Sequence, residues 1–267
     1  MLSLVKNNCS GSNSMIISAL FIIFFISCGD LDRSNPLDPK NPNSHTAQIV
    51  LIEAFVSQVR DEPYSNYALD ALENLSDDYK NSVIVLEYHV NSSIGDDSLA
   101  TEENYKRYKE YEMNESKRAV PDIYISGDFA RIQGASSVDA AQDRYLEVLP
   151  TAINEVSNFT IEAQATLKAM ELQINVSVAQ LGKDDAQNVL INGVIVRDYY
   201  TKNQRQVVSR FTLLEAISTL EAGTIQTFKF SMQLTPDIIN DDLQVIVFGQ
   251  VGKSGPVLQA VRAELDT

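Results

Sequence analysis

Two cysteines are the residues of this chain best suited to redox chemistry, and their positions point away from that use. Cys28 ends an apolar run in the sequence Ile26-Ser27-Cys28-Gly29, and Cys9 lies upstream of it. A small residue before a lone cysteine, after an apolar segment, is typical of a bacterial lipoprotein signal. If the signal peptidase cleaves before Cys28 and the sulfur carries a lipid such as palmitate, the mature chain has no free thiol.

The apolar segment itself has the length of a signal peptide. It runs from Met15 to Ile26, which is too short to span a bilayer comfortably. Lys6 is the only positive charge ahead of it, and Met15 is an alternative start to Met1. The competing interpretation is an uncleaved anchor or a buried core helix. We expect residues 1–27 to be a lipoprotein signal peptide.

Residues 28–47 are expected to form a lipidated, extended tether. Prolines and turn-forming residues fill the sequence Asn35-Pro36-Leu37-Asp38-Pro39-Lys40-Asn41-Pro42-Asn43, which disfavours helix. Acyl chains contribute roughly 0.8 kcal/mol per buried CH₂, so several chains on Cys28 attach the protein firmly to a membrane. We expect a cell-envelope location in the outer membrane, although Asp30 and Asp32 leave the inner membrane open.

The charge of the chain excludes one class of partner. The net charge is −15, and no cluster of Lys and Arg is present. Because binding to phosphates requires such clusters, nucleic acid is not an expected partner. About 220 residues follow the tether, enough for one large domain or two ordinary ones, and the pattern predicts two, at residues 48–157 and 158–267.

Residues 48–157 alternate strand-like and helix-like patterns. Nearly continuous apolar runs predict strands that are covered on both faces. The expected strands are 49–55, 83–90 and 119–127, with a hairpin to 129–132; the expected helices contain residues 67–75, cover about 102–115, and run from Ser136 or Ser137 to about Val156. The fold class is therefore α/β for this part.

This order of elements resembles thioredoxin. Residues 51–58, Leu-Ile-Glu-Ala-Phe-Val-Ser-Gln, resemble the strand before the redox loop of secreted thioredoxin-like proteins, and Val120-Pro121 resembles their cis-proline turn. From Gln48 to Leu265 the chain is similar to a family of thioredoxin-like outer-membrane lipoproteins that carry a C-terminal β-sandwich. The resemblance implies a thioredoxin-like domain followed by a sandwich.

The loop that carries the chemistry in this family differs here. Active members have Cys-x-x-Cys at the start of a helix, where the first thiol is activated. The matching positions are Arg60, Asp61, Glu62 and Pro63. The resemblance therefore implies a redox-inactive domain. As charged loop residues, these four are more simply a solvated loop than a ligand site.

Val120 and Pro121 form a candidate peptide-binding edge. In thioredoxin-like proteins the residue before the cis-proline pairs with an extended peptide as a short added strand. Such a surface could remain after the thiols are lost. The alternative is that Pro121 only maintains a turn of the fold.

Residues 158–267 have the alternating pattern of half-buried antiparallel strands. About seven such runs in about 105 residues predict an all-β, immunoglobulin-like sandwich. Phe228, Phe230, Met232 and Leu234 are expected to fill one face of its core.

No set of residues for another kind of catalysis is visible. His89 lies near Asp96 and Asp97 and could bind a metal, but a polar residue at a strand end is the simpler interpretation. The acidic turn at 237–242 lacks the calcium-loop pattern. Neither a Ser-His-Asp set nor a phosphate-binding loop occurs, so we predict no metal site and no cofactor.

The expected function is that of a lipid-anchored, non-enzymatic binding or scaffolding protein. Its expected partners are a membrane, through the lipid on Cys28, and a protein or peptide. Two alternatives remain. One is a periplasmic folding helper that holds extended peptides at Val120, and the other is a thiol-disulfide oxidoreductase, which would require a reactive thiol in the processed protein.

Overall fold

The computed structural model describes residues 35, 38, 41–59, 62–111, 114–199, 204–205, 207–236 and 243–266. Asn35–Thr267 form one compact unit. The expected signal peptide, Cys28, Arg60, Asp61 and the acidic turn at 237–242 lie outside the described residues, as does most of the tether. No helix in the described ranges is both long and apolar enough to cross a membrane.

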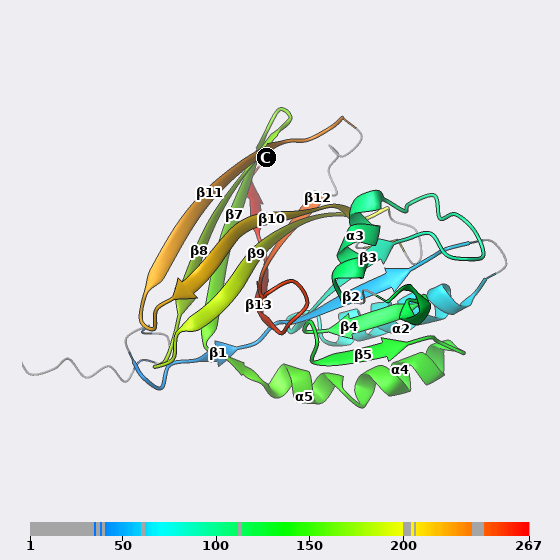
Figure 1. Ribbon diagram of the computed structural model, residues 1–267, viewed down its shortest axis with the longest axis horizontal. Helices are drawn as coiled ribbons and strands as arrows, with labels where there is room; N and C mark the ends of the chain where they lie inside the picture. Colours follow the sequence, from blue (N-terminus) through cyan, green and yellow to red (C-terminus); the bar gives the residue numbers. More distant parts are fainter. Residues whose placement is uncertain are drawn as a thin grey trace, which may run out of the picture. The chain divides into compact units, whose positions relative to one another are not determined.

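The first half of this unit combines strands with helices (Figure 1). Its elements are β1 (Thr46–Ala47), β2 (Val50–Val56), α2 (Tyr64–Asp78), β3 (Val83–His89), α3 (Glu102–Tyr111), the 3-10 turn η1 (Glu115–Lys117), β4 (Asp122–Ile125), β5 (Ala130–Gln133), α4 (Val138–Leu146), α5 (Leu149–Asn154) and β6 (Val156–Ser157). β2 and β3 run parallel, β4 is antiparallel to β2, and β5 is antiparallel to β4.

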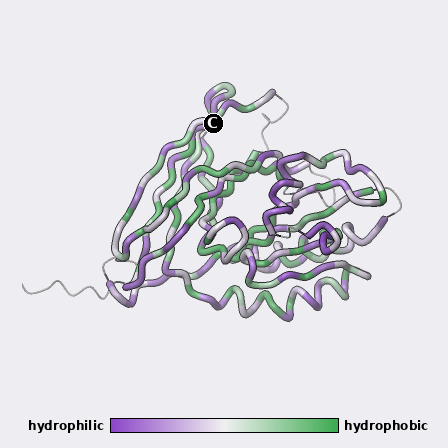
Figure 2. The backbone as a smooth tube through the Cα atoms, viewed as in Figure 1, coloured by the Kyte–Doolittle hydropathy of each residue, from purple (hydrophilic) through white to green (hydrophobic). Residues whose placement is uncertain are grey.

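β2 and β3 are buried along their whole length, as their continuous apolar sequences predict. Alternate residues point to opposite faces of the sheet. Ile52 and Ala54 belong to a core shared with α2 and α4, whereas Leu51 and Phe55 belong to another that includes Tyr108 of α3. Figure 2 shows the hydrophobic central strands beside the hydrophilic α3.

Three details differ from the sequence-based expectation. The helix expected up to Val156 is divided into α4 and α5, because Pro150 lies in the first turn of α5 and cannot continue a preceding helix. The helix expected to reach about residue 115 is α3, Glu102–Tyr111 in its described part, and Glu115 belongs to the separate 3-10 turn η1. The end of the predicted tether is packed: Ser44 is buried, and its hydroxyl accepts a hydrogen bond from the N–H of Gly182 at 2.9 Å.

The second half consists of strands. They are β7 (Phe159–Lys168), β8 (Glu171–Gln180), β9 (Ala186–Arg197), β10 (Val207–Leu220), β11 (Ile225–Gln233), β12 (Leu243–Val251), β13 (Val257–Arg262) and β14 (Glu264–Asp266). One sheet has the order β11-β8-β7-β14, and β13-β12-β9-β10 continue into the sheet of the first half. The coarser prediction, an α/β part followed by a mainly β part, is confirmed.

The core between these two layers contains the residues that the alternation predicts. Phe228, Phe230 and Met232 of β11 pack against it while partly exposed, and Leu234 is buried. The period-2 pattern therefore identifies the inward face of β11 correctly.

The two halves share a sheet and a core. Val207 of β10 pairs with Glu87 of β3, which joins the strands in the order β13-β12-β9-β10-β3-β2-β4-β5. One apolar cluster contains Leu51 and Tyr88 from the first half and Phe248 from the second. The division at residues 157 and 158 stays a prediction, but the packing across it is extensive.

Gly127 shows how closely the halves approach. It has a φ of +75°, which favours glycine, and a Cβ built there would lie 2.1 Å from the carbonyl oxygen of Gly255. The N–H of Val257 also donates to the carbonyl of Ser126 at 3.0 Å. A side chain at position 127 would therefore separate the turn after β4 from the turn before β13.

Candidate functional site

The residues predicted to match the redox loop of thioredoxin-like proteins, Arg60 to Pro63, lie between β2 and α2. Pro63 directly precedes the first residue of α2, and the Glu62 carboxylate accepts a hydrogen bond from the N–H of Tyr64 at 3.1 Å. Of the four predicted loop residues, these last two are described. Both stand at the start of a helix, where a thiol would be activated if one were present.

The Val120–Pro121 peptide bond is cis, as the resemblance implied. The carbonyl of Ala119 accepts from the Gln133 side chain at 3.0 Å, and that of Pro121 accepts from the N–H of Gly134 at 2.8 Å. Within the described part of the chain, the backbone of Val120 between them makes no hydrogen bond. The N–H and the carbonyl of this half-buried residue are thus without a hydrogen-bond partner among the described residues.

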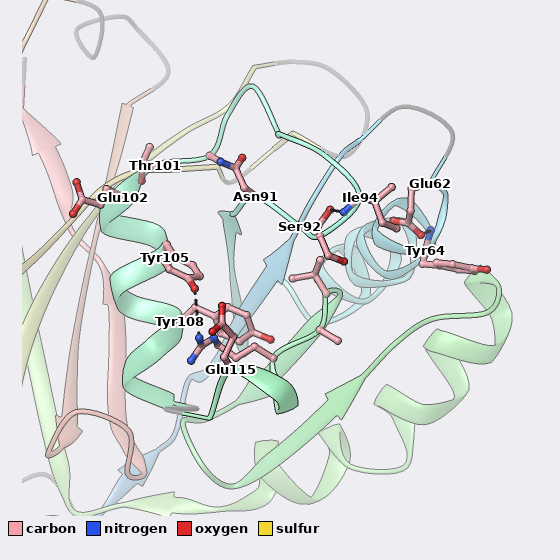
Figure 3. Close-up of a pocket in the computed structure, with 15 residues that line it drawn as sticks. Glu62, Tyr64, Asn91, Ser92, Ile94, Thr101, Glu102, Tyr105, Tyr108 and Glu115 are labelled. Carbon is pink, nitrogen blue, oxygen red and sulfur yellow. Dashed lines mark hydrogen bonds between the residues drawn. The ribbon is translucent and has the colours of Figure 1, made fainter.

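A cavity of about 850 Å³ brings the two predicted regions together (Figure 3). Glu62 and Val120 both line it, although they come from loops at different places in the chain. Its other lining residues are Tyr64, Asn91, Ser92, Ser93, Ile94, Ala100, Thr101, Glu102, Tyr105, Tyr108, Glu115, Arg118 and Ala119. The volume lies in the range of ligand-binding pockets.

The lining residues provide aromatic and polar contacts. Tyr64 is 51% exposed, and Ile94 is 68% exposed on the loop that faces it. The Arg118 guanidinium donates to the Tyr105 hydroxyl at 3.4 Å, so the inner wall is already organised by a side-chain hydrogen bond. The lining contains no cysteine. These groups can bind a ligand by stacking and hydrogen bonding, but they include no thiol nucleophile.

Tyr108 at the inner end of the cavity is held by a buried carboxylate. Its hydroxyl donates to Asp122 at 2.5 Å, and the Arg131 guanidinium donates to the same carboxylate at 2.7 and 2.9 Å. Burial and the hydrogen bond to Asp122 raise the pKa of Tyr108. Tyr108 is therefore a neutral hydrogen-bond donor whose position is fixed, and it is not suited to act as a base.

His89 lies beside one of the two aspartates expected near it. Its Nδ1 is 2.7 Å from Asp97, and its Nε2 is 3.8 Å from Glu87. Glu87 was missed, although residues two apart on a strand share a face, and this signal could have found it. No group of three or more His, Cys, Asp or Glu side chains suited to a metal ion occurs among the described residues.

A second buried charge pair was also missed by sequence reasoning. Arg107 of α3 donates two hydrogen bonds to the Glu53 carboxylate, at 2.7 and 2.9 Å. It also donates to the side chain of Gln250 and to the carbonyl of Lys253, both in the second half. The available signal was a glutamate within an apolar strand, because a charge is buried there only when it is paired.

Comparisons with protein-family models give no match to this chain. Comparisons with curated protein sequences give none either.

Solved structures do show similarity. HBP35 of Porphyromonas gingivalis matches 82% of this chain and 76% of its own, with a TM-score of 0.59 and 12% identity. Protein AGR_C_4864 from Agrobacterium tumefaciens matches 82% of this chain and 95% of its own, with a TM-score of 0.52 and 20% identity. At such low identity these likenesses show a shared fold alone.

Proposed function

We propose that this chain is a non-enzymatic binding protein of the cell envelope that holds an extended peptide in the cavity beside Val120. One observation carries the proposal. A cavity of about 850 Å³ lies between the loop that contains Glu62 and the cis-proline turn, and Val120, whose backbone makes no hydrogen bond to the described residues, lines it. An extended segment that enters the cavity can pair with this backbone as a short strand.

A redox-inactive, thioredoxin-like first half is part of the proposal. The order β2-α2-β3-α3-β4-β5-α4 and the sheet order β3-β2-β4-β5 support the thioredoxin-like assignment. Arg60-Asp61-Glu62-Pro63 stand at the positions expected for Cys-x-x-Cys, and the only cysteines in the sequence are Cys9 and Cys28. A protein processed at Cys28 would keep the binding surface without the chemistry.

The proposed location follows from the signal sequence. Cleavage before Cys28 and acylation of its sulfur would anchor the mature chain to a membrane of the envelope. Mass spectrometry of the protein from membranes tests this directly. We expect an N-terminus at Cys28 with added acyl mass, which the Cys28→Ala variant lacks.

The binding test uses an unfolded chain as the probe. Reduced, carbamidomethylated ribonuclease A is extended and has no free thiol, and fluorescence anisotropy of a labelled sample reports its binding to the protein purified from membranes. Val120→Pro deletes a backbone donor and should weaken binding at least about tenfold, the equivalent of one hydrogen bond of about 1.4 kcal/mol. Val120→Ala retains the donor and is the matched control.

A second pair of variants tests the aromatic contact. Tyr64→Ala removes an exposed ring from the cavity, and Phe129→Ala removes one of similar exposure that does not line it. We expect weaker binding only for Tyr64→Ala. Unchanged binding in both Val120→Pro and Tyr64→Ala would contradict the proposed site, and reduction of insulin by the processed protein would contradict the non-enzymatic assignment.

A further inference from the structure

The cavity has a buried histidine behind two of the loops that line it. His89 is the last residue of β3, and its side chain is fully buried. Its Nδ1 lies 2.7 Å from Oδ2 of Asp97, and its Nε2 lies 3.8 Å from Oε2 of Glu87. Within the described residues Nε2 has no hydrogen-bond partner. This nitrogen can therefore gain or lose a proton without breaking a hydrogen bond of its own.

Asp97 connects this histidine to both loops. Its carboxylate accepts hydrogen bonds from the N–H of Gln58 at 2.7 Å and from the N–H of Leu99 at 2.9 Å, and its own N–H donates to the Asn91 side chain at 3.0 Å. Gln58 begins the loop that leads to Glu62. Asn91 and Leu99 belong to the loop of residues 91–100, five of which line the cavity. The Asp97 carboxylate thus holds the bases of both loops.

Two charged side chains of the described residues face the His89 ring. Among the described residues, Glu87 faces it from its own strand β3 and Asp97 from the loop, while α3 contributes the neutral Asn104, which donates to the His89 carbonyl at 3.2 Å. Before β10, the N–H of Arg205 donates to Glu87 at 3.2 Å.

The guanidinium of Arg205 is directed away from His89 and toward other carboxylates. It lies 3.5 Å from Glu73 of α2 and 3.3 Å from Asp198 after β9, so it is shared with two other carboxylates. From β2 and its extension, Val56 pairs with His89 in the sheet and Gln58 is neutral. Of the described groups, two carboxylates therefore face the imidazole.

We propose that the proton on His89 Nε2 controls the loop of residues 91–100: the loop is held closed against Gln58 when His89 is charged and is loosened when His89 is neutral. In the charged form, the imidazolium bridges Asp97 and Glu87. In the neutral form, Nδ1–H still donates to Asp97, but the lone pair of Nε2 faces the carboxylate of Glu87. This repulsion acts inside the fold, where water screens it little.

The direction of the pH effect follows from the same contacts. Burial lowers the pKa of His89, but the hydrogen bond to Asp97 and the negative charges of Asp97 and Glu87 outweigh it, so the pKa is raised overall. A raised pKa means that the folded arrangement is favoured at low pH and loses this support as pH rises through the folded-state pKa. The loop control stands without any ligand. Its consequence for binding, tighter association below that pKa, rests on the proposed function.

Amide hydrogen exchange of the ligand-free protein tests the proposal. We expect exchange of residues 91–100, corrected for the intrinsic pH dependence, to rise as His89 loses its proton, by about tenfold for each tenfold difference in proton affinity between the closed and loosened states. His89→Gln should remove this pH step. His45→Gln, which changes the only other histidine of the sequence, should retain it.

The result that would overturn the proposal is a step of equal size in His89→Gln, or no step in the wild-type protein. If His89→Gln fails to fold, NMR of the wild type decides: the amide shifts of Gln58 and Leu99 must titrate together with the His89 ring. Independent titration would overturn the proposal. These measurements need no peptide, so their failure is distinguishable from a failure to bind unfolded ribonuclease A.

Discussion

The two halves of the described unit differ in what they bury. In the first half, Glu53, Glu87, His89, Asp97, Arg107 and Asp122 are buried. Among the described residues of the strand half, the buried polar side chains are the amides Gln180, Asn192, Gln250 and Gln259. Buried charges are destabilising unless they are paired, so a fold built for stability alone has little use for them.

The buried charges of the first half lie beside the cavity that we propose as the binding site. Asp122 fixes Tyr108 at the inner end of the cavity, and Asp97 holds two loops that line it. Arg107 lies on α3, which also carries the lining residues Glu102 and Tyr105. The charges of the first half thus support the cavity, whereas strand-half residues such as Phe248 pack against the apolar core of the first half.

The largest effect is expected at the buried pair of Glu53 and Arg107. Arg107→Met leaves the carboxylate without its ion-pair partner and should lower the free energy of unfolding by about 3–5 kcal/mol, measured by urea denaturation. Gln250→Leu removes a neutral partner of the same arginine and should have a smaller effect. Equal losses of unfolding free energy in the two variants would contradict the distinction between the buried charges of the first half and the buried amides of the second.

A smaller effect is expected at the turn where the halves meet. Gly127 and Gly134 both have positive φ, but a Cβ would clash with Gly255 only at the first, since nothing lies within 4 Å at the second. Gly134→Ala should lower the free energy of unfolding by about 1 kcal/mol, and Gly127→Ala by a further 1–3 kcal/mol or so. Similar losses in thermal or urea unfolding would mean that this approach of the two turns contributes little.

The pH dependence of stability sharpens the comparison further. The hydrogen bond with His89 and two backbone donors lower the pKa of Asp97 despite burial, while the pKa of His89 is raised. Stability should therefore decline as pH falls through the folded-state pKa of Asp97 and as pH rises through that of His89. Each decline should amount to about 1.4 kcal/mol for every tenfold difference in proton affinity between the folded and unfolded states. In the His89→Gln variant, the urea midpoint should no longer decrease as pH rises through this range.

The smallest change in stability is expected at the cavity surface. Tyr64 is half exposed, so Tyr64→Ala should change the free energy of unfolding by no more than about 0.5 kcal/mol, as should Phe129→Ala. Circular dichroism during thermal unfolding measures this. A large loss of unfolding free energy in Tyr64→Ala would mean that the ring packs in the core and is not free to contact a peptide.

Local patterns in the sequence predicted most of the strands. The strands of the second half follow from alternation, and the buried strands β2 and β3 follow from continuous apolar runs, because strand burial is visible within a few residues. The division between α4 and α5 was missed although Pro150 is present. The helix-like pattern continues past Pro150, so the pattern alone predicts one helix where the proline separates two.

The site was predicted in part. The positions of Glu62 and Val120 came from resemblance, and the structure shows that they line one cavity. Arg107 and Glu53 are separated by 54 positions, so no local pattern connects them. The pairing of β10 with β3 likewise joins residues far apart in the sequence, Val207 and Glu87, so no local pattern predicts it.

The most direct test of the central claim is NMR of the protein, purified from membranes in detergent, during titration with unfolded, carbamidomethylated ribonuclease A. We predict amide shifts at Tyr64, at residues 91–101 and at Val120, with none in β7 and β8. An absence of shifts, or shifts confined to the strand half, would contradict the assignment of the cavity as the peptide-binding site.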